Sequence, residues 1–598
     1  MSGSLNERRV GLALALIAIL FYPLLLWRGW GCWNDAIVDY GRELYVPWRI
    51  NEGDVLYRDI AYFNGPLSPY INALWFFVGG VGLRTLTIAN AIIALVFGVV
   101  LYRRTKSSGG PIAAGITLLA FEFIFACGHY PGTGNYNFLS PYSHELTHGL
   151  LLALLAFSCA LRARAEGTTR WAWAAGLLLG LCFLTKAEVF VAAAGSISWI
   201  LALAWRSREA GILRRAAIIA GSAALCPLIA FALLALAMPL GDALYATMGS
   251  WTGIFGSTAS DLLFYKIYTG FDRAGENLAA IFSSCAVLIA ILTPAALFDR
   301  FQGNRPLALR LTAGLVYSGA IIVLFKQADL LPFDWLLIAR FLPLFVLLAL
   351  GAASLCALRG EKEQRALWGE RAGFALFALL MMLKMILLAI LAHYGFALAV
   401  CAVAIFAIVI LEWLPALCRG ENSRGLTLRL AGITLILVTI SAYWMMSESV
   451  FASKNVVVSE GADQFNAITP HGQFLNELLV QVDDRIGKDQ SLLVFPEGVM
   501  VNYLTRRKTP ARQINFMPPE IALFGEENLV KELRQAESPA AVILIHKDTT
   551  EYGFPLFGTH YGMKLMGWAQ RNYKPDWLIG DPPLQPTTRF GIGLLGPR

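Results

Sequence analysis

The sequence predicts an α-helical polytopic membrane protein with a small C-terminal α/β domain, and three observations support this prediction. Of the 598 residues, 57% are hydrophobic and only 15% are charged, which lies outside the usual composition of soluble globular chains. Apolar runs of about 18 or more residues, long enough to cross a bilayer as helices, recur from the N-terminus to about residue 446. Beyond that point the long runs stop, and shorter patterns typical of strands and helices replace them.

About thirteen spans are expected in the first three quarters of the chain. The first follows Arg8 and Arg9 in the manner of a signal peptide, but no small-residue cleavage site follows it, so we expect this span to be retained. The expected spans cover residues 10–27, 85–102, 111–127, 144–162, 171–185, 187–205, 214–238, 278–297, 309–326, 335–357, 372–392, 394–413 and 427–446.

Lys and Arg residues are concentrated in every second connection between these spans. Because such residues stay on the cytoplasmic side, the pattern predicts a cytoplasmic N-terminus, and the odd number of spans then exports the C-terminus. The net charge of +7 therefore belongs to short loops beside the membrane, and no nucleic-acid partner is expected. The predicted organisation is a transmembrane domain over residues 1–446, with exported loops at 28–84, 128–143 and 239–277, and an exported soluble domain over residues 447–598.

Three short segments predict the fold of the soluble domain. Residues 491–495 and 541–546 are typical of buried strands, and residues 526–536 of a helix between them. Since this module is tethered to the membrane at one end only, we interpret it as a cap or an acceptor-binding lid rather than as a second catalytic domain. The loop at 239–277 is rich in Gly, Tyr and Trp, and it could close over a ligand or simply be mobile.

Acidic residues near a bilayer are costly and usually have a function, and the first exported loop holds several. Residues 34–45 are typical of an interfacial helix in which Asp35 and Asp39 share one face. A structural interpretation is also open, in which Asp35 caps the helix and Asp39 pairs with Arg42.

Two other carboxylates are candidates for the same exported site. Asp59 precedes a Gly-Pro turn that returns the chain to the membrane, and it could bind a metal or pair with Arg58. Glu145 opens the span at 144–162, where the helix dipole tolerates a carboxylate whether or not it has a function.

The segment His144-Glu145-Leu146-Thr147-His148 matches the H-E-x-x-H pattern, in which two histidines one turn apart bind zinc and the glutamate activates water. The pattern needs a third protein ligand, which the sequence does not reveal. An intramembrane zinc metalloprotease is therefore an alternative function, and His148 is also a candidate ligand in another kind of metal site.

Cations at the exported ends of spans are candidates for holding a lipid phosphate. Lys186 interrupts apolar sequence where two spans meet, and Arg340 lies near the exported end of a later span. Lys326 is a third candidate. A salt bridge between Lys186 and Glu188 is the structural alternative.

These residues, in this order, resemble the GT-C superfamily of polytopic glycosyltransferases, which includes protein O-mannosyltransferases and the lipid A aminoarabinose transferase. In that family an aspartate motif follows the first span, and Asp39 in the segment Val-Asp-Tyr-Gly-Arg-Glu matches its position. The segment from Val55 to Tyr70 resembles the family's return to the membrane through an acid and then prolines. Glu145 matches the acid of the second loop, and Lys186 resembles the family's lysine between later spans.

Two departures from the family leave the question of a metal open. The family's common Asp-Glu pair is Asp39-Tyr40 here, so one expected carboxylate is missing. His144 and His148 are not part of the family pattern.

The resemblance implies that a sugar is transferred, with inversion, from a polyprenyl-phosphate donor to a hydroxyl of a glycan, lipid or protein acceptor, at the outer face of a bacterial inner membrane. A lipid phosphate leaves without protonation, so such an enzyme needs a base for the acceptor and cations for the phosphate. A divalent metal ion against the phosphate is an open possibility. The resulting candidates are Asp39 as the base, Asp59 and Glu145 as further catalytic residues, Lys186 and Arg340 as phosphate-binding residues, Asp59, Glu145 and His148 as metal ligands, and Trp33, Tyr62 and Tyr265 as sugar-stacking or anchoring aromatics.

A lipid or solute transporter is the remaining alternative. A transporter should show internal repeats and acids within its spans. No convincing repeat is found in this sequence, and the candidate site acids lie in loops.

Overall fold

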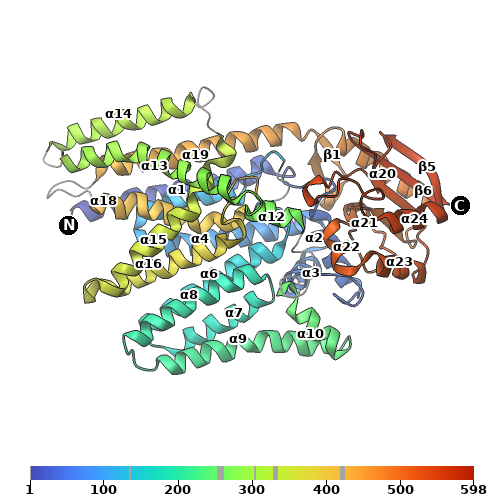
Figure 1. Cartoon of the computed structure of the whole chain (residues 1–598), viewed down its shortest axis with the longest axis horizontal. Coiled ribbons are helices and arrows are strands. Elements are labelled where there is room, and N and C mark those ends of the chain that lie inside the picture. The colour runs from blue at the N-terminus through green and yellow to red at the C-terminus, as the bar shows by residue number, and fades with distance from the viewer. Residues whose placement is uncertain (1, 133–135, 252–261, 302–304, 328–333, 418–424) are drawn as a thin grey trace.

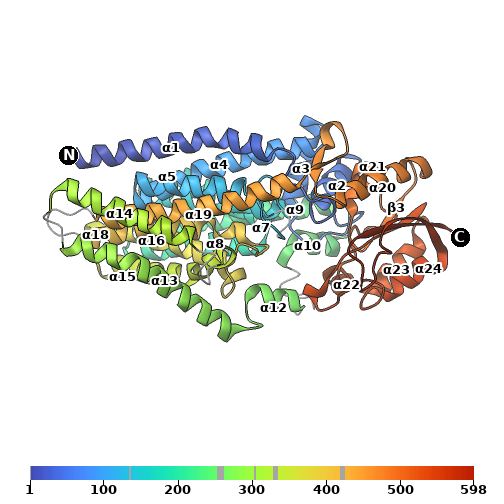
Figure 2. The same ribbon diagram turned by 90° about the horizontal axis from the view of Figure 1, so that it is seen from above.

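The structure, a computed structural model, describes residues 2–132, 136–251, 262–301, 305–327, 334–417 and 425–598. Figures 1 and 2 show an elongated bundle of helices that holds the N-terminus at one end and meets a mixed domain of helices and strands at the other. The predicted fold class, an α-helical membrane protein with a small C-terminal α/β domain, is confirmed.

Eleven helices in the described residues are long and apolar enough to cross a membrane, and two shorter apolar helices, Pro111–Ala126 and Thr169–Phe183, lie among them. Together they fall at the thirteen expected spans. The bundle comprises α1 (Ser2–Gly29), α4 (Leu83–Gly109), α5 (Pro111–Ala120), α6 (His144–Glu166), α7 (Thr169–Phe183), α8 (Ala187–Arg206), α9 (Ile212–Ala235), α13 (Ala274–Phe301), α14 (Leu307–Lys326), α15 (Leu342–Arg359), α16 (Lys362–Met381), α17 (Val400–Ile408), α18 (Leu414–Leu417) and α19 (Leu426–Ser453).

One span lies earlier in the chain than the sequence predicts. The expected span at 372–392 corresponds to α16, which begins at Lys362 and continues as a short 3₁₀ helix to Met385. Hydrophobicity alone could not define this boundary, because the apolar residues continue past the helix end into the buried segment 386–399. The shift places Lys384 at the end of a helix instead of inside a span.

The connections predicted to be exported contain short helices at the end of the bundle that meets the soluble domain (Figures 1 and 2). Part of the predicted loop at 239–277 lies outside the described residues. The helices in these connections are α2 (Tyr40–Asn51), α3 (Leu67–Gly79), α10 (Leu240–Met248) and α12 (Leu263–Thr269).

The soluble domain contains a four-stranded sheet of order β3-β4-β6-β5, in which β3 and β4 are parallel and the other pairs antiparallel. Strands β3 and β4 and helix α23 fall where the sequence predicts them. Strand β5 was missed because most of its residues are exposed, and β6 because three of its seven residues are glycine. The elements are β1 (Val456–Val458), β2 (Phe465–Ala467), α20 (His471–Arg485), β3 (Leu492–Phe495), α21 (Val499–Thr505), α22 (Pro518–Phe524), α23 (Glu526–Gln535), β4 (Ala541–Ile545), α24 (Met563–Asn572), β5 (Tyr573–Gly580) and β6 (Gly591–Pro597).

The soluble domain is attached to the bundle by packing as well as by the chain. Leu44 of α2 and Val494 of β3 belong to one hydrophobic core. Helix α2 packs against α21 so closely that a Cβ at Gly41 would lie 2.5 Å from the backbone nitrogen of Met500. The chain connects the module to the bundle at one end only, as expected, but the first loop and the soluble domain also share apolar side chains.

Candidate functional site

A cavity of about 1620 Å³ lies where the bundle meets the soluble domain. Its walls come from the first two predicted exported loops, from the start of α8, from the 3₁₀ helix after α16, from α12, from the end of α19, and from the soluble domain. The charged side chains in its lining include Asp39, Arg42, Lys186, Glu188, Lys384, Glu497, Glu520 and Lys547.

Asp39 is held at the start of α2 by contacts that the sequence did not reveal. Its backbone has a φ of +58°, a conformation that residues other than glycine seldom adopt. Its backbone N–H donates to Glu497 Oε1 at 3.3 Å, and Glu497 Oε2 lies 3.1 Å from the ammonium of Lys547. The soluble domain therefore contributes an ion pair directly beside Asp39.

The expected helix over residues 34–45 begins only at Tyr40. Asp35 Oδ1 accepts the backbone N–H groups of Ile37 and Val38, both at 2.9 Å, and this turn replaces the first part of the helix. Asp35 and Asp39 consequently do not share a helix face.

Burial, followed by the nearby charge of Glu497, raises the pKa of Asp39 to about 7. Arg42 and Lys547 oppose this shift but do not cancel it. A carboxylate with this pKa is a stronger base than an ordinary aspartate and is about half ionised at neutral pH.

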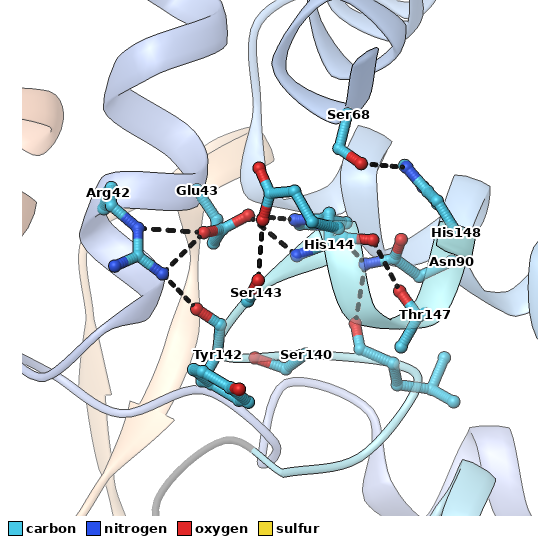
Figure 3. Close-up of polar contacts among 12 residues, drawn as sticks. Arg42, Glu43, Ser68, Asn90, Ser140, Tyr142, Ser143, His144, Thr147 and His148 are labelled. Atoms are coloured by element: carbon cyan, nitrogen blue, oxygen red, sulfur yellow. Dashed lines mark hydrogen bonds and ion pairs between the residues drawn. The ribbon is translucent and has the colours of Figure 1, made fainter. Parts of the chain in front are cut away.

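A buried network joins α2 to the start of α6 (Figure 3). Arg42 donates two hydrogen bonds of 3.0 Å to Glu43 Oε1, so the alternative in which Arg42 pairs with Asp39 is wrong. Glu43 Oε2 lies 2.5 Å from His144 Nδ1, and His144 Nε2 lies 3.0 Å from the Asn90 amide nitrogen. Both ring nitrogens of His144 are thus already engaged.

Replacing Glu43 with glutamine is expected to lower the free energy of unfolding by about 3 kcal/mol, because the change leaves Arg42 buried without its carboxylate. Thermal unfolding of the purified protein in detergent measures the effect, with Glu52→Gln as the control because Glu52 is exposed. Equal midpoints for Glu43→Gln and the parent would contradict the prediction.

The same pair gives a pH dependence with a definite sign. Burial raises the pKa of Glu43, but Arg42 and His144 outweigh it and lower the pKa to about 2. The stabilisation is therefore complete above the ordinary carboxyl pKa and is lost as the pH falls toward 2. The difference between parent and variant should shrink on acidification.

Glu145 lies at the first turn of α6, as predicted, but it is not part of the described lining of the cavity. It is fully buried, and it accepts hydrogen bonds from the Tyr62 hydroxyl and from the Ser143 hydroxyl, the latter at 2.6 Å. Burial lowers the pKa of Arg42, but the charges of Glu43, Tyr62, Asp39 and Glu145 outweigh this and raise it.

The three predicted metal ligands do not come together. Asp59 is partly exposed and pairs with Arg58 at 2.7 Å. His148 contacts the Ser68 hydroxyl at 3.1 Å through Nδ1, and no donor or acceptor among the described residues reaches its Nε2. Across the ranges that the structure describes, no group of three His, Cys, Asp or Glu side chains could hold a metal ion. These residues do not fit a metal centre, and the engaged nitrogens of His144 do not fit a zinc protease site.

Two lysines meet at one tyrosine on the bundle side of the cavity. The buried ammonium of Lys186 donates to the Tyr142 hydroxyl at 3.1 Å, and that of Lys384 lies 3.5 Å from the same oxygen. Glu188 pairs with Lys384 at 3.2 Å, and the structural alternative, a salt bridge between Lys186 and Glu188, is not formed. The positive charge of Lys186 is therefore compensated by no carboxylate within salt-bridge distance among the described residues.

Arg340 does not join this pair. It lines a separate pocket of about 330 Å³ among apolar residues such as Phe125, Leu288 and Phe406. The described lining of the large cavity contains neither Arg340 nor Asp59, Glu145 or His148. The second cation beside Lys186 is Lys384 and not Arg340, the other candidate for binding the phosphate. The position of Lys384, as an isolated lysine inside an apolar run, is the signal in the sequence that could have identified it.

Aromatic side chains cover much of the remaining wall. Tyr552 of the soluble domain stacks on Phe264 of α12, with ring centroids 4.6 Å apart. Tyr265 lines the cavity, as expected of a stacking residue. Trp33 and Tyr62 are buried outside the described lining of the cavity. The Trp33 indole donates to the Cys127 carbonyl at 2.9 Å, and the Tyr62 hydroxyl donates to Glu145.

No protein-family model matches the sequence, and no curated protein is significantly similar to it. Among solved structures, an oligosaccharyltransferase from Archaeoglobus fulgidus in its apo form aligns with 98% of this chain and 74% of its own, at 14% identity and a TM-score of 0.48. ArnT from Cupriavidus metallidurans bound to undecaprenyl phosphate aligns with 98% of this chain and 97% of its own, at 14% identity and a TM-score of 0.41. These alignments are too distant to assign the residues of the cavity.

Proposed function

We propose that this protein is an inverting membrane glycosyltransferase that moves a sugar from a polyprenyl-phosphate donor to an acceptor hydroxyl at the extracytoplasmic face. One observation supports it most: Asp39 and the pair Lys186 and Lys384 line the same cavity at the end of a membrane-spanning bundle. A base and a cationic site in one chamber are the two components that this transfer requires.

In the proposed reaction, Asp39 accepts the proton of the acceptor hydroxyl while the oxygen of that hydroxyl attacks the anomeric carbon. The bond between that carbon and the phosphate oxygen breaks, and the electron pair leaves with the polyprenyl phosphate. The phosphate thereby gains one negative charge. Lys186 and Lys384 meet this charge, so the leaving group needs no proton.

The orientation of the protein belongs to the proposal. The predicted exported loops and the soluble domain lie at one end of the bundle, opposite the N-terminus (Figure 1). The basic connections predict that the N-terminal end is cytoplasmic. We therefore place the cavity on the outer side of a bacterial inner membrane.

The proposal is tested by incubating the purified full-length protein with a panel of radiolabelled polyprenyl-phosphate sugars and of glycan, lipid and peptide acceptors, with and without a chelator. We expect release of polyprenyl phosphate from at least one donor. A protein that consumes none of the donors would refute the function, and chelator-sensitive peptide hydrolysis would favour the zinc protease instead.

A further inference from the structure

The wall of the cavity that faces the lysines belongs to the soluble domain, and its position follows from the topology of the sheet. Strands β3 and β4 are parallel neighbours, with Phe495 paired to Leu544. Glu497 follows the carboxyl end of β3, and Lys547 follows that of β4. Ligands of α/β sheets bind outside the carboxyl ends of such strands. Here that edge opens into the cavity.

Two side chains on this wall carry oxygen atoms that lack a partner. Asn515 is only 6% exposed, and its Oδ1 is buried without a donor among the described residues. Glu520 Oε2 on α22 is in the same situation. Unsatisfied buried acceptors are costly, and such atoms in a cavity lining indicate a ligand that donates hydrogen bonds.

The Glu520 carboxyl and the proposed base line the same cavity, and their charges interact. Burial raises the pKa of Glu520 to about 7, and the charges of Arg42, Glu497 and Asp39 all act on the same carboxyl group. The stacked rings of Tyr552 and Phe264 border the same space with a flat apolar surface. A ligand that lies on these rings and donates to Asn515 and Glu520 would hold a further hydroxyl close to Asp39.

We propose that this wall is the acceptor subsite and that the acceptor is a saccharide, whose hydroxyl groups donate to Asn515 and Glu520 while its ring lies against Tyr552. The proposal rests on the transferase function above. A saccharide offers several donors on one rigid ring with an apolar face. A lipid alcohol offers a single hydroxyl, and a serine or threonine side chain likewise offers one.

The test measures saccharide binding without any donor present. Methyl glycosides of hexoses, pentoses and N-acetylhexosamines are titrated, by saturation-transfer NMR, into the full-length protein in nanodiscs. We expect at least one glycoside to bind the parent, and Asn515→Ala combined with Glu520→Ala to weaken it about tenfold or more. Glu520→Gln keeps a carbonyl acceptor and should retain most of the binding.

Matched controls separate this subsite from the fold and from the donor site. Glu537→Ala makes the same change at an exposed position of the soluble domain and should not affect glycoside binding. Binding of radiolabelled polyprenyl phosphate should be equal in all variants, and thermal unfolding reports whether each variant is folded.

Each outcome is decisive. The inference is overturned if no glycoside binds the parent, if the double variant binds as tightly as the parent, or if only serine- and threonine-containing peptides or diacylglycerol bind in a manner that these residues control. Failure of the parent to bind polyprenyl phosphate would instead count against the transferase function.

Discussion

Asp39→Asn is expected to reduce the turnover number of sugar transfer by about 10²–10⁴-fold, the usual contribution of a general base. Asparagine has nearly the same size and keeps the backbone N–H that donates to Glu497, so the fold should persist. Initial rates with a donor from the panel measure the effect, and binding of polyprenyl phosphate should remain near the parental value.

Asp54→Asn is the matched control for this variant, because Asp54 lies in the same loop and pairs with Arg49 at 2.8 Å. Its turnover should stay within about twofold of the parent, as for most surface changes. A parental rate for Asp39→Asn would remove Asp39 as the base.

The pH profile provides an independent check on the same residue. Because the pKa of Asp39 is raised to about 7, the rate should fall as the pH drops through 7 and the base becomes protonated. Glu497→Gln removes the charge that contributes to this shift and should move the midpoint to lower pH. An unchanged midpoint would show that Glu497 does not act on the base.

Changing both Lys186 and Lys384 to methionine is expected to reduce kcat/KM for the donor by about 10²–10³-fold, as when preorganised charge stabilisation is removed from a transition state. Methionine keeps much of the apolar volume of each side chain while it removes the ammonium groups that meet at Tyr142. Initial rates over a range of donor concentrations give kcat and KM separately.

The single variants distinguish the two lysines. Lys384 is paired with Glu188 and Lys186 is not, so Lys186→Met should have the larger effect on the donor. Lys266→Met removes the same charge from an exposed position of the cavity lining and serves as the control. Equal kinetics for the double variant and the parent would place the donor phosphate elsewhere.

Much of the bundle could be predicted from sequence because the signal is local. A span needs about 20 consecutive apolar residues, and a helix satisfies its backbone hydrogen bonds within that same segment. The positions of the spans, and the place of Glu145 at the start of α6, therefore follow from stretches of chain that can be identified one at a time. Only the boundaries of the span at α16 were predicted too late in the chain, because buried apolar residues continue past the helix end.

The site itself depended on contacts between distant segments. Asp39 meets Glu497 across 458 positions of the chain, and Lys384 meets Tyr142 across 242. Asp59 and Glu145 were equally plausible site residues by composition. In the structure, Asp59 pairs with Arg58. Glu145 accepts hydrogen bonds from the hydroxyls of Tyr62 and Ser143.

Sequence by itself thus determined the membrane bundle, the strands β3 and β4, and Asp39 and Lys186 as side chains of interest. Only the tertiary structure decided that the soluble domain forms one wall of the cavity, that Lys384 lies beside Lys186, and that Asp59, Glu145, His148 and Arg340 lie outside its described lining. The physical reason is that the length of an apolar run is a property of one segment. Which partners surround a charged side chain depends instead on how distant segments pack together.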